Sequence, residues 1–505
     1  MSVYYRPFET CNIPNVQLVV IQKDGIDGAL LDDGGGRDFE RNDSQNVEID
    51  RKLTEEFTLM REGSTTLLVP AESLRTNVPP RTPAFFNPAA KLSRDISTLM
   101  YNSFVRLHGS LFEKVPITLA DAFSGIGARA IRVAREIPSV DKVILNDLNP
   151  VAISAARKSA KINDVEDKCA FSQKDVHVFL NERNSKKKER YVIVDLDPFG
   201  SPSPYVDSLV RAVADGGLVS VTATDTAVLY GKYPKVCFRK YGSKPINCSY
   251  SNEIAVRILI SLIGLVAGRM DLSIEPVFAH SHRHYSRVYV KVHVNSNEAN
   301  KLIDNLGYIT HCFNCGGRKD HRLVFPSPLS CSTCGKNNNA DENKLSIAGP
   351  LWIKPIFNKR LIADILRADG NTYSDRSIDV SRDDYAPAPK YRDTNLTLGD
   401  HNNSGYETER SLLTQSPLSI DSGQASSQKY FHKIFQLFHI AGQELDDQPY
   451  YYTIDEVGSA MKTSPSPMNT FLERLSQGGF RASRTSFRPT GFKTNASLEE
   501  IKKLL

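Results

Sequence analysis

The chain lacks the features that mark several large classes of protein. Its 505 residues carry a formal net charge of only +5, so any nucleic-acid surface has to come from local patches of basic residues. We see no apolar run long enough to span a bilayer, and the N-terminal residues do not resemble a secretory signal peptide. We therefore expect a cytoplasmic protein with no membrane segment, and no obligate protein partner is evident from the sequence.

Cysteine is also scarce, with eight residues in the whole chain. Four of these cysteines form two Cys-x-x-Cys pairs: Cys312, Cys315, Cys331 and Cys334. In a cytoplasmic chain this pattern favours metal binding over disulfides, and four thiolates suit a tetrahedral structural Zn²⁺. Gly316 and Gly335 directly follow the two pairs, where they permit the tight turns of a zinc knuckle. A site closed by four protein ligands is not expected to be catalytic.

Large apolar residues are sparse in two segments, 24–50 and 368–428. Such segments cannot bury enough apolar surface to fold, so we predict a loop or insertion in the first and a disordered insertion in the second. The chain as a whole is 40% hydrophobic and 24% charged, which is ordinary for a globular protein. Its length is sufficient for two or three domains with substantial cores.

The most informative stretch spans residues 191–200. A β-branched apolar run is typical of a buried parallel strand, and Asp197-Pro198-Phe199-Gly200 then ends it at a turn. Ligands of open α/β sheets bind beyond the carboxyl ends of the strands. Asp197 can accept an N–H from the exocyclic amine of a base and take its proton, the Pro198 region offers a backbone carbonyl, and Phe199 can stack on the base. The alternative is an ordinary strand-end turn capped by an aspartate.

Strands and helices alternate along the first part of the chain. This alternation predicts an α/β fold with a doubly wound parallel sheet, of the Rossmann-like class. Residues 57–70 are typical of a small hairpin, and a helix is expected to open after Asn87-Pro88. The predicted strands of the sheet are 117–123, 143–147, 170–175, 191–197 and 218–224, with helices over 150–162 and 203–214 among those between them.

A glycine-rich loop, Gly125-x-Gly127-x-x-Ala130, follows the first strand of the predicted sheet. Glycines let the backbone approach a ligand closely at the start of a helix. Asp147 lies about 20 residues further on, at the position where an acid binds a ribose diol in dinucleotide folds. The loop therefore fits two classes of enzyme, a nicotinamide-dependent dehydrogenase and an S-adenosylmethionine-dependent methyltransferase.

Two further acids favour the methyltransferase. Asp121, directly before the glycine loop, suits a sulfonium cofactor with an amino-acid tail and would repel a pyrophosphate. Asp175 ends the third strand and could receive an adenine amino group. Together with Asp197-Pro198-Phe199 these acids favour methyl transfer, while a non-catalytic scaffold of the same fold is a further alternative.

Basic and aromatic residues alternate between Asp225 and Glu253, a stretch that contains no acid. Such a mixture suits a phosphate backbone with unstacked bases, although a solvated loop has the same composition. Residues 280–287 contain three histidines beside arginines, which we predict to lie in a loop that faces RNA, with metal binding as the alternative. The basic and aromatic residues between the two acids are Tyr230, Lys232, Tyr233, Lys235, Phe238, Arg239, Lys240, Tyr241 and Lys244.

The C-terminal residues predict a second nucleic-acid module. Helices are expected over 430–438 and near 454–461 and 467–476, and the following segment 479–488 is basic, in a run with no acid between Glu473 and Glu499. Three helices and a basic β-wing are typical of a winged-helix-like domain. A helical subdomain that packs on the catalytic domain is the alternative.

These motifs together resemble the tRNA (guanine-26-N2)-dimethyltransferase family, which uses S-adenosyl-L-methionine to form N2,N2-dimethylguanosine in tRNA. The resemblance covers roughly residues 55–365 and 430–500. The matching motifs are Phe85-Phe86-Asn87-Pro88 with Ser93-Arg94-Asp95, Asp121 to Arg129, Asn146-Asp147, Asp197-Pro198-Phe199-Gly200, Thr222-Ala223-Thr224-Asp225, and Gly479 to Thr485 with Pro489-Thr490-Gly491.

The resemblance implies roles for individual residues. Asp197 would bind and deprotonate the target amine, with Phe85 and Phe199 holding the flipped guanine. DNA adenine and rRNA guanine methyltransferases with this core usually carry two prolines after the acid, whereas this chain carries only Pro198. A different RNA guanine-N2 methyltransferase is the alternative function. The implied cofactor contacts are Arg94, Arg129, Asp147, Asp175 and Val176.

We predict five segments in the chain. They are an N-terminal extension with an acidic glycine-rich loop (1–54), a methyltransferase domain (55–300), a zinc-binding part of the C-terminal domain (301–367), the disordered insertion (368–428, placed within that domain) and a winged-helix-like tRNA-binding part (429–505).

Overall fold

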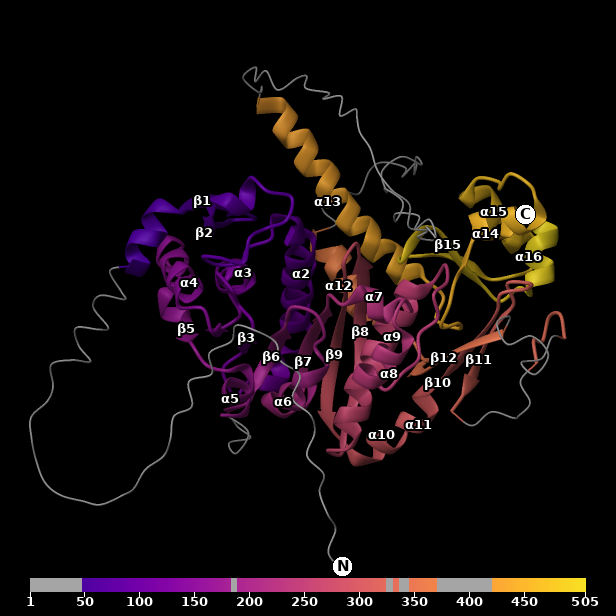
Figure 1. The fold of residues 1–505 in the computed structure, drawn as a ribbon, viewed down its shortest axis with the longest axis horizontal. Helices are drawn as coiled ribbons and strands as arrows, with labels where there is room; N and C mark the ends of the chain where they lie inside the picture. The colour runs from indigo at the N-terminus through magenta and orange to yellow at the C-terminus, as the bar shows by residue number, and fades with distance from the viewer. Residues whose placement is uncertain (1–47, 183–188, 324–329, 336–344, 370–419) are drawn as a thin grey trace, which may run out of the picture. The chain divides into compact units, whose positions relative to one another are not determined.

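The computed structural model describes residues 48–182, 189–323, 330–335, 345–369 and 420–505, and only the backbone of 420–429 (Figure 1). Residues Arg51–Leu505 form one compact unit. Almost all of the predicted segment 24–50 and most of 368–428 lie outside the described residues. Helix α13 already begins at Ile420, ten residues earlier than the helix predicted from the sequence. The boundaries at 300, 367 and 428 stay predictions.

A seven-stranded sheet is the centre of this unit, in the order β5-β4-β3-β6-β7-β9-β8. Neighbouring strands from β5 to β7 are parallel, and β9 is antiparallel to both β7 and β8. The predicted α/β fold with a largely parallel sheet is therefore confirmed. The strands are β3 (Thr118–Asp121), β4 (Lys142–Asn146), β5 (Cys169–Ser172), β6 (Tyr191–Leu196), β7 (Val213–Ala223), β8 (Leu272–His282) and β9 (Tyr285–Val294).

Local sequence signals set where several helices begin. Asn149 caps α4, whose first residue is Pro150, because its side chain accepts from the backbone of Val151. Helices α2, α3 and α4 pack together, as do α5, α6 and α9. The helices around the sheet are α2 (Lys91–His108), α3 (Ala128–Glu136), α4 (Pro150–Ile162), α5 (Val176–Asn181), α6 (Val206–Ala212), α7 (Thr226–Leu229), α8 (Pro234–Tyr241) and α9 (Ser251–Gly268).

The chain reverses its direction across the sheet between β3 and β6. From β3 it adds β4 and β5 on one side, and it then returns to place β6 and β7 on the other. Asp121 at the end of β3 is in register with Asp195 near the end of β6. Ligand sites of open α/β sheets lie at such a switch point, beyond the carboxyl ends of the strands. Asp197 lies two residues after Asp195, directly beyond the end of β6, so it stands at this edge.

Helix α9 corrects the expectation that no run is long enough to span a bilayer. Ser251–Gly268 has 18 residues with a mean hydropathy of 1.5, which passes a length and composition test, and it is the one such helix in the part of the chain described here. The helix is 72% buried inside the fold, where it packs on β8, β9 and β12 (Leu345–Trp352). Its apolar character is therefore explained by its position in the core.

The prediction of an RNA-facing loop over residues 280–287 is wrong for most of the segment. His280 and Arg287 are buried, and they lie in β8 and β9, which turn at Arg283 and His284. Burial lowers the pKa of His280 well below its usual value, so the ring is neutral and unsuited to phosphate. The alternating histidines at 280, 282 and 284 belong to the strands and turn of a hairpin rather than to a loop.

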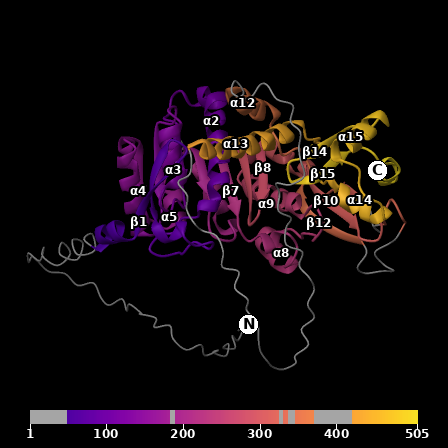
Figure 2. The same ribbon diagram turned by 90° about the horizontal axis from the view of Figure 1, so that it is seen from above.

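Two small sheets and seven helices complete the described C-terminal residues. One sheet has the order β11-β10-β12 and the other β13-β15-β14, and Figure 2 shows α12 and α13 on the opposite side of β8 from α8 and α9. The N-terminal hairpin is β1 (Phe57–Glu62) and β2 (Thr65–Pro70), as predicted. The remaining elements are α10 (Ser296–Asn300), α11 (Leu302–Asn305), β10 (Leu306–Cys312), β11 (Arg318–Arg322), α12 (Lys359–Asp369), α13 (Ile420–Gln443), β13 (Tyr452–Thr453), α14 (Ile454–Met461), α15 (Met468–Gln477), β14 (Ala482–Thr485), β15 (Arg488–Thr494) and α16 (Leu498–Leu504).

The basic C-terminal motif is tied into the fold by a buried glutamate. Glu444 accepts hydrogen bonds from the Thr485 hydroxyl at 3.0 Å and from the Ser486 backbone at 2.8 Å. Lys493 bridges Glu444 at 3.0 Å and Glu253 of α9 at 2.7 Å, and all three charged side chains are buried. Thr485, Ser486 and Lys493 therefore fasten the C-terminal residues to helix α9 through these two glutamates.

Candidate active site

The turn after β6 places one acid and one ring at the edge of the sheet. The side chain of Asp197 is 29% exposed, Pro198 is buried and Phe199 is 60% exposed. The Gly200 backbone N–H donates to the Thr224 hydroxyl at 2.6 Å, and the Thr224 backbone N–H donates to the Gly200 carbonyl at 2.9 Å. These bonds fix the turn to the end of β7, so Asp197 and Phe199 are held by the sheet itself.

Phe85 and Phe199, the two rings that the family resemblance implies for the target base, contact each other. Their ring centroids are 4.7 Å apart with the planes at 81°, and the guanidinium of Arg81 lies 5.1 Å from the Phe199 centroid. Phe85 is half-buried, whereas the neighbouring Phe86 is in the core. The pair offers a partly exposed aromatic surface beside the carboxylate of Asp197.

The glycine loop between β3 and α3 contacts Asp147. Gly125 and Gly127 have φ values of +53° and +78°, which L-residues with a Cβ rarely adopt. A Cβ on Gly127 would lie 2.7 Å from the Leu145 side chain, so close packing also requires this glycine. The backbone N–H of Gly125 donates to Asp147 Oδ2 at 2.9 Å. The loop and the predicted ribose-binding acid are therefore one local unit.

Asp175 caps the N-terminus of α5, because its Oδ1 accepts from the backbone of His177 at 2.8 Å. Its side chain is exposed, and the next residue, Val176, is buried. Asn146 joins this cap to the end of β4 through two hydrogen bonds with the backbone of Lys174. Asp175 thus stands at the same edge of the sheet as Asp147, one strand further out.

Arg129 connects the Asp197–Gly200 turn to the interior of the protein. It lies in the first turn of α3, and its Nη2 donates to Asp197 Oδ2 at 2.7 Å. Its Nη1 donates to Asp195 Oδ1 at 2.9 Å. One buried guanidinium therefore bridges the two aspartates of the strand-end sequence, and it orients the Asp197 carboxylate.

A fully buried charge network lies below this bridge, and sequence reasoning missed it. Asp195 accepts from Arg129 and from Arg287 Nη2, the latter at 2.6 Å, and it also receives the Tyr101 hydroxyl. Asp195, Arg287 and Tyr101 all have 0% exposure. The signal in the sequence was Asp195, a charged residue inside an apolar strand. A charge at such a buried position requires partners of opposite charge. The hydroxyl groups that complete the network belong to Ser97, Ser220, Thr222 and Tyr289.

Arg94, which the resemblance implies as a cofactor contact, forms hydrogen bonds to Glu62 and to the backbone of Asn87 in this structure. Its Nε and Nη2 each lie 2.7 Å from an oxygen of buried Glu62, and its Nη1 donates to the Asn87 carbonyl at 3.1 Å. Arg132 and Asp95 extend this pair into a second buried network. Arg94 therefore holds the segment that carries Phe85 and Phe86 against α2.

Asp121 is the most perturbed acid at the switch point. Its side chain is buried, and its Oδ1 has no hydrogen-bond partner among the described residues. Burial, together with the negative charge of Asp195 on the neighbouring strand, raises the pKa of Asp121 to about 8. A buried acid with an unpartnered oxygen beside the glycine loop fits a cationic ligand group.

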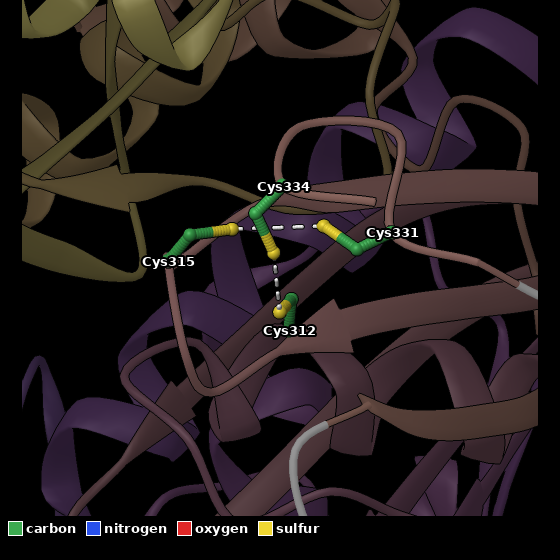
Figure 3. A group of neighbouring side chains, drawn as sticks. All are labelled: Cys312, Cys315, Cys331 and Cys334. Carbon is green, nitrogen blue, oxygen red and sulfur yellow. Dashed lines mark hydrogen bonds between the residues drawn. The ribbon is translucent and has the colours of Figure 1, made fainter. Parts of the chain in front are cut away.

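The four predicted cysteines converge at the end of β10 (Figure 3). All four sulfur atoms lie within 4.8 Å of one another. The Cys312–Cys334 and Cys315–Cys331 sulfur distances are 3.7 and 3.6 Å, close to the edge of about 3.8 Å that a tetrahedron with Zn–S bonds of about 2.3 Å requires. Gly316 and Gly335 have φ values of +82° and +69°, so the predicted tight turns are present.

Arg318 joins this cluster to the rest of the C-terminal residues. It is buried three residues after Cys315, and it donates to the backbone of Tyr451 and to Glu456. Its guanidinium lies 4.3 Å from the ring centroid of Tyr250, just before α9. The position of the cysteine cluster therefore affects contacts between the two small sheets and α9.

Comparison with known proteins agrees with this arrangement. The family model described as N2,N2-dimethylguanosine tRNA methyltransferase matches residues 63–382 and 413–505. A tRNA (guanine(26)-N(2))-dimethyltransferase of Methanothermobacter thermautotrophicus is 30% identical over 446 residues, which are 88% of this chain and 98% of the relative. A tRNA (guanine(26)-N(2)/guanine(27)-N(2))-dimethyltransferase of Aquifex aeolicus is 33% identical over 305 residues, or 60% of this chain and 73% of the relative.

The fold is also that of a solved structure. The structure of Trm1 from Pyrococcus horikoshii with S-adenosyl-L-methionine superposes with a TM-score of 0.64, at 24% identity, over 88% of this chain and 99% of that one. The motifs, the fold and the length of the family match lead to one conclusion. The chain belongs to the N2,N2-dimethylguanosine tRNA methyltransferase family.

Proposed function

We propose that Asp197 is the acceptor and base in the reaction of this family, the twofold methylation of N2 of guanosine 26 in tRNA with S-adenosyl-L-methionine. The observation that carries the proposal is the turn itself, with a carboxylate beside two partly exposed rings at the switch point of the sheet. Arg129 donates a hydrogen bond to Oδ2 of Asp197, so we assign Oδ1 as the oxygen that accepts from the amine.

The N2 amine of guanine is a poor nucleophile, because its lone pair is delocalised into the ring. Asp197 accepts one N–H and orients the lone pair, and Phe85 and Phe199 hold the flipped base. S-adenosyl-L-methionine supplies an electrophilic methyl group on a sulfonium. The N–CH₃ bond forms as the S–CH₃ bond breaks, the bonding pair stays with sulfur, and Asp197 receives the proton of the amine. The second transfer needs the same groups after the methylated amine has turned about its C–N bond.

The residues at the strand ends fit the methyl donor. We assign Asp147 to the ribose hydroxyls, Asp175 and Val176 to the adenine, and the Gly125–Gly127 loop with Asp121 to the cationic methionine end. Arg129 and Arg94 remain implied contacts, and both already hold buried carboxylates in this structure. The unpartnered oxygen of Asp121 is the feature that best supports this assignment.

Cofactor binding is expected to depend on pH through Asp121. With a pKa of about 8, Asp121 is mostly protonated at pH 6, and a cationic group favours its ionised form. Affinity for S-adenosyl-L-methionine should therefore rise between pH 6 and 7.5, with a slope of up to about tenfold per pH unit. Isothermal titration calorimetry measures this slope. The Asp121→Asn variant should lose it, and because any titration of the cofactor is common to both proteins, equal slopes would exclude the role of Asp121.

We also propose a structural Zn²⁺ at the four cysteines. The sulfur spacing supports it, and the two glycine turns give the backbone of a zinc knuckle. The four residues would hold the ion as thiolates and leave no open position, so its contribution would be to folding and to the Arg318 contacts.

Removal of the metal should therefore affect stability more than chemistry. Mass spectrometry of the purified protein is expected to find one zinc per chain, and Cys312→Ser should lose it together with cooperative unfolding of the C-terminal residues. Cys169→Ser is the matched control, because Cys169 is half-buried in β5 and lies outside the cluster. Zinc-free wild-type protein with unchanged thermal unfolding would contradict the proposal.

The residues after 429 are proposed to bind tRNA as a winged-helix-like part. Support comes from helices α14 and α15 beside the hairpin of β14 and β15, and from the exposed side chains of Arg481 and Arg488. Arg481, just before β14, pairs with Asp447, whereas exposed Arg488 of β15 donates to the Ser249 carbonyl at 3.5 Å. Arg488 is therefore the better candidate for a phosphate contact. Buried Lys493 is excluded from this role.

The function is tested by incubating the protein with S-adenosyl-L-methionine and an unmodified tRNA, followed by nucleoside mass spectrometry. N2,N2-dimethylguanosine is the expected product, and N2-methylguanosine should appear first. An equimolar rRNA fragment in the same reaction tests the alternative of another RNA guanine-N2 methyltransferase. Methylation of that fragment in preference to tRNA would favour the alternative.

A further inference from the structure

A basic and aromatic surface lies next to the catalytic turn and has no role in the chemistry described above. It follows β7, whose end is bonded to the turn, and it consists of α8 and the residues on either side of that helix (Figure 1). We call it the α8 surface. Its exposed members are Lys232, Tyr233, Lys235, Phe238, Arg239 and Lys244.

Helix α8 divides into a buried face and an exposed face. Cys237 and Tyr241, four residues apart, are buried against the fold. Lys235, Phe238 and Arg239 lie on the other side, and Phe238 is 61% exposed. A large ring that faces solvent between two cations has no packing function in the described protein, so this face is available to a partner.

The charge of the α8 surface is uniformly positive. Residues 226–252 contain no aspartate or glutamate. The two acids that border this segment are withdrawn from solvent, because Asp225 accepts from Tyr241 and Lys240, and Glu253 is fully buried. An anionic partner is therefore favoured along the whole face.

The surface is held in a fixed position relative to Asp197. The Tyr241 hydroxyl donates to Asp225 Oδ1 at 2.6 Å, and the Ser201 hydroxyl donates to Tyr241 at 2.9 Å. Ser201 directly follows the Asp197–Gly200 turn. A partner bound on α8 is thus positioned against the turn by side chains that are themselves buried or half-buried.

We propose that the α8 surface binds the nucleotides that flank the target guanosine, with Tyr233 and Phe238 stacking on unpaired bases and the four cations contacting phosphates. This proposal rests on the function proposed above and names where the substrate RNA is held. Exposed rings between cations suit single-stranded RNA, since every base has a face that stacks. An acidic protein would need the cations but would leave the two rings without a matching group.

The test compares tRNA binding by full-length variants, measured by fluorescence anisotropy across a range of salt concentrations. Phe238→Ala should weaken binding about 5- to 100-fold through the lost stacking. The double variant Lys235→Ala/Arg239→Ala should also lower the slope of log K against log salt by about 1.5, for two phosphate contacts. Both variants should keep wild-type affinity for S-adenosyl-L-methionine.

Lys161→Ala is the matched control. Lys161 is an exposed cation near the C-terminus of α4, and this end of the helix lies away from the strand ends that carry Asp147 and Asp197. It should leave both the affinity and the salt slope unchanged. Phe238 and Arg239 are exposed, so thermal unfolding of their variants should match the wild type.

The outcomes separate this proposal from the function itself. If the wild type dimethylates tRNA while the α8 variants bind it with wild-type affinity and slope, the α8 surface is not an RNA site and the function stands. If only the charge variant weakens binding, stacking by Phe238 is excluded and the proposal as stated fails. If the wild type methylates no tRNA, the proposed function fails irrespective of α8.

Discussion

Replacement of Asp197 by alanine is expected to lower the rate of methyl transfer about 10²–10⁴-fold, the usual contribution of a positioned acid or base. The physical reason is that no other carboxylate among the described residues shares the turn with Phe199. Affinity for S-adenosyl-L-methionine should stay within a few-fold, because the predicted cofactor acids Asp121, Asp147 and Asp175 are unchanged. Single-turnover kinetics at saturating tRNA, with calorimetry of cofactor binding, measure the two quantities.

Two further variants sharpen this experiment. Asp197→Asn keeps the shape and a hydrogen-bond acceptor but cannot take a proton at the same oxygen, so its rate should also fall. Asp207→Ala removes an exposed acid of α6 that pairs with Arg211 four residues further on, and it should leave the rate unchanged. An Asp197→Ala variant that retained most of its single-turnover rate would remove Asp197 from the catalytic role.

Replacement of Asp195 by asparagine is expected to destabilise the protein by about 3–5 kcal/mol, although Asp195 touches no substrate in this account. The substitution leaves the guanidinium groups of Arg129 and Arg287 buried without their shared carboxylate. Urea unfolding at pH 7 measures the change. Asp207→Asn on the surface should change stability by no more than about 0.5 kcal/mol, and a similarly small effect at Asp195 would contradict the buried network.

The stability that Asp195 contributes should depend on pH. Burial raises its pKa, but Arg129 and Arg287 outweigh this effect and hold the pKa below its ordinary value. A depressed native pKa means that the contribution is complete above about pH 4, where the unfolded carboxyl is ionised, and is lost as the pH falls through the native value. The difference in unfolding free energy between wild type and Asp195→Asn should therefore shrink on acidification.

The sequence was sufficient for features that depend on local patterns. The hairpin of β1 and β2, the limits of α4 and the alternation of strands and helices follow from periodicity, Asn149-Pro150 and glycine positions. The convergence of the four cysteines is also confirmed. Each of these features was predictable because a spacing or a turn residue is sufficient to specify it.

Features that depend on distant contacts were not predictable in the same way. Asp195, Arg287 and Tyr101 are far apart in the chain, and only the sheet brings them together. Residues 280–287 looked like a basic loop until the hairpin of β8 and β9 buried His280 and Arg287. The C-terminal motif looked like an exposed wing, although Glu444 and Lys493 bind much of it to α9. In each case tertiary burial decides the role of a charge.

The activity of this family is the methylation of N2 of guanosine 26, and position 26 is its sharpest test. The most direct measurement uses two unmodified tRNA transcripts that differ only in guanosine or adenosine at position 26, each incubated with S-adenosyl-L-methionine and mapped by mass spectrometry. We expect N2,N2-dimethylguanosine at position 26 of the first transcript and none at that position in the second. Equal methylation of both transcripts, or methylation at another position alone, would contradict this expectation.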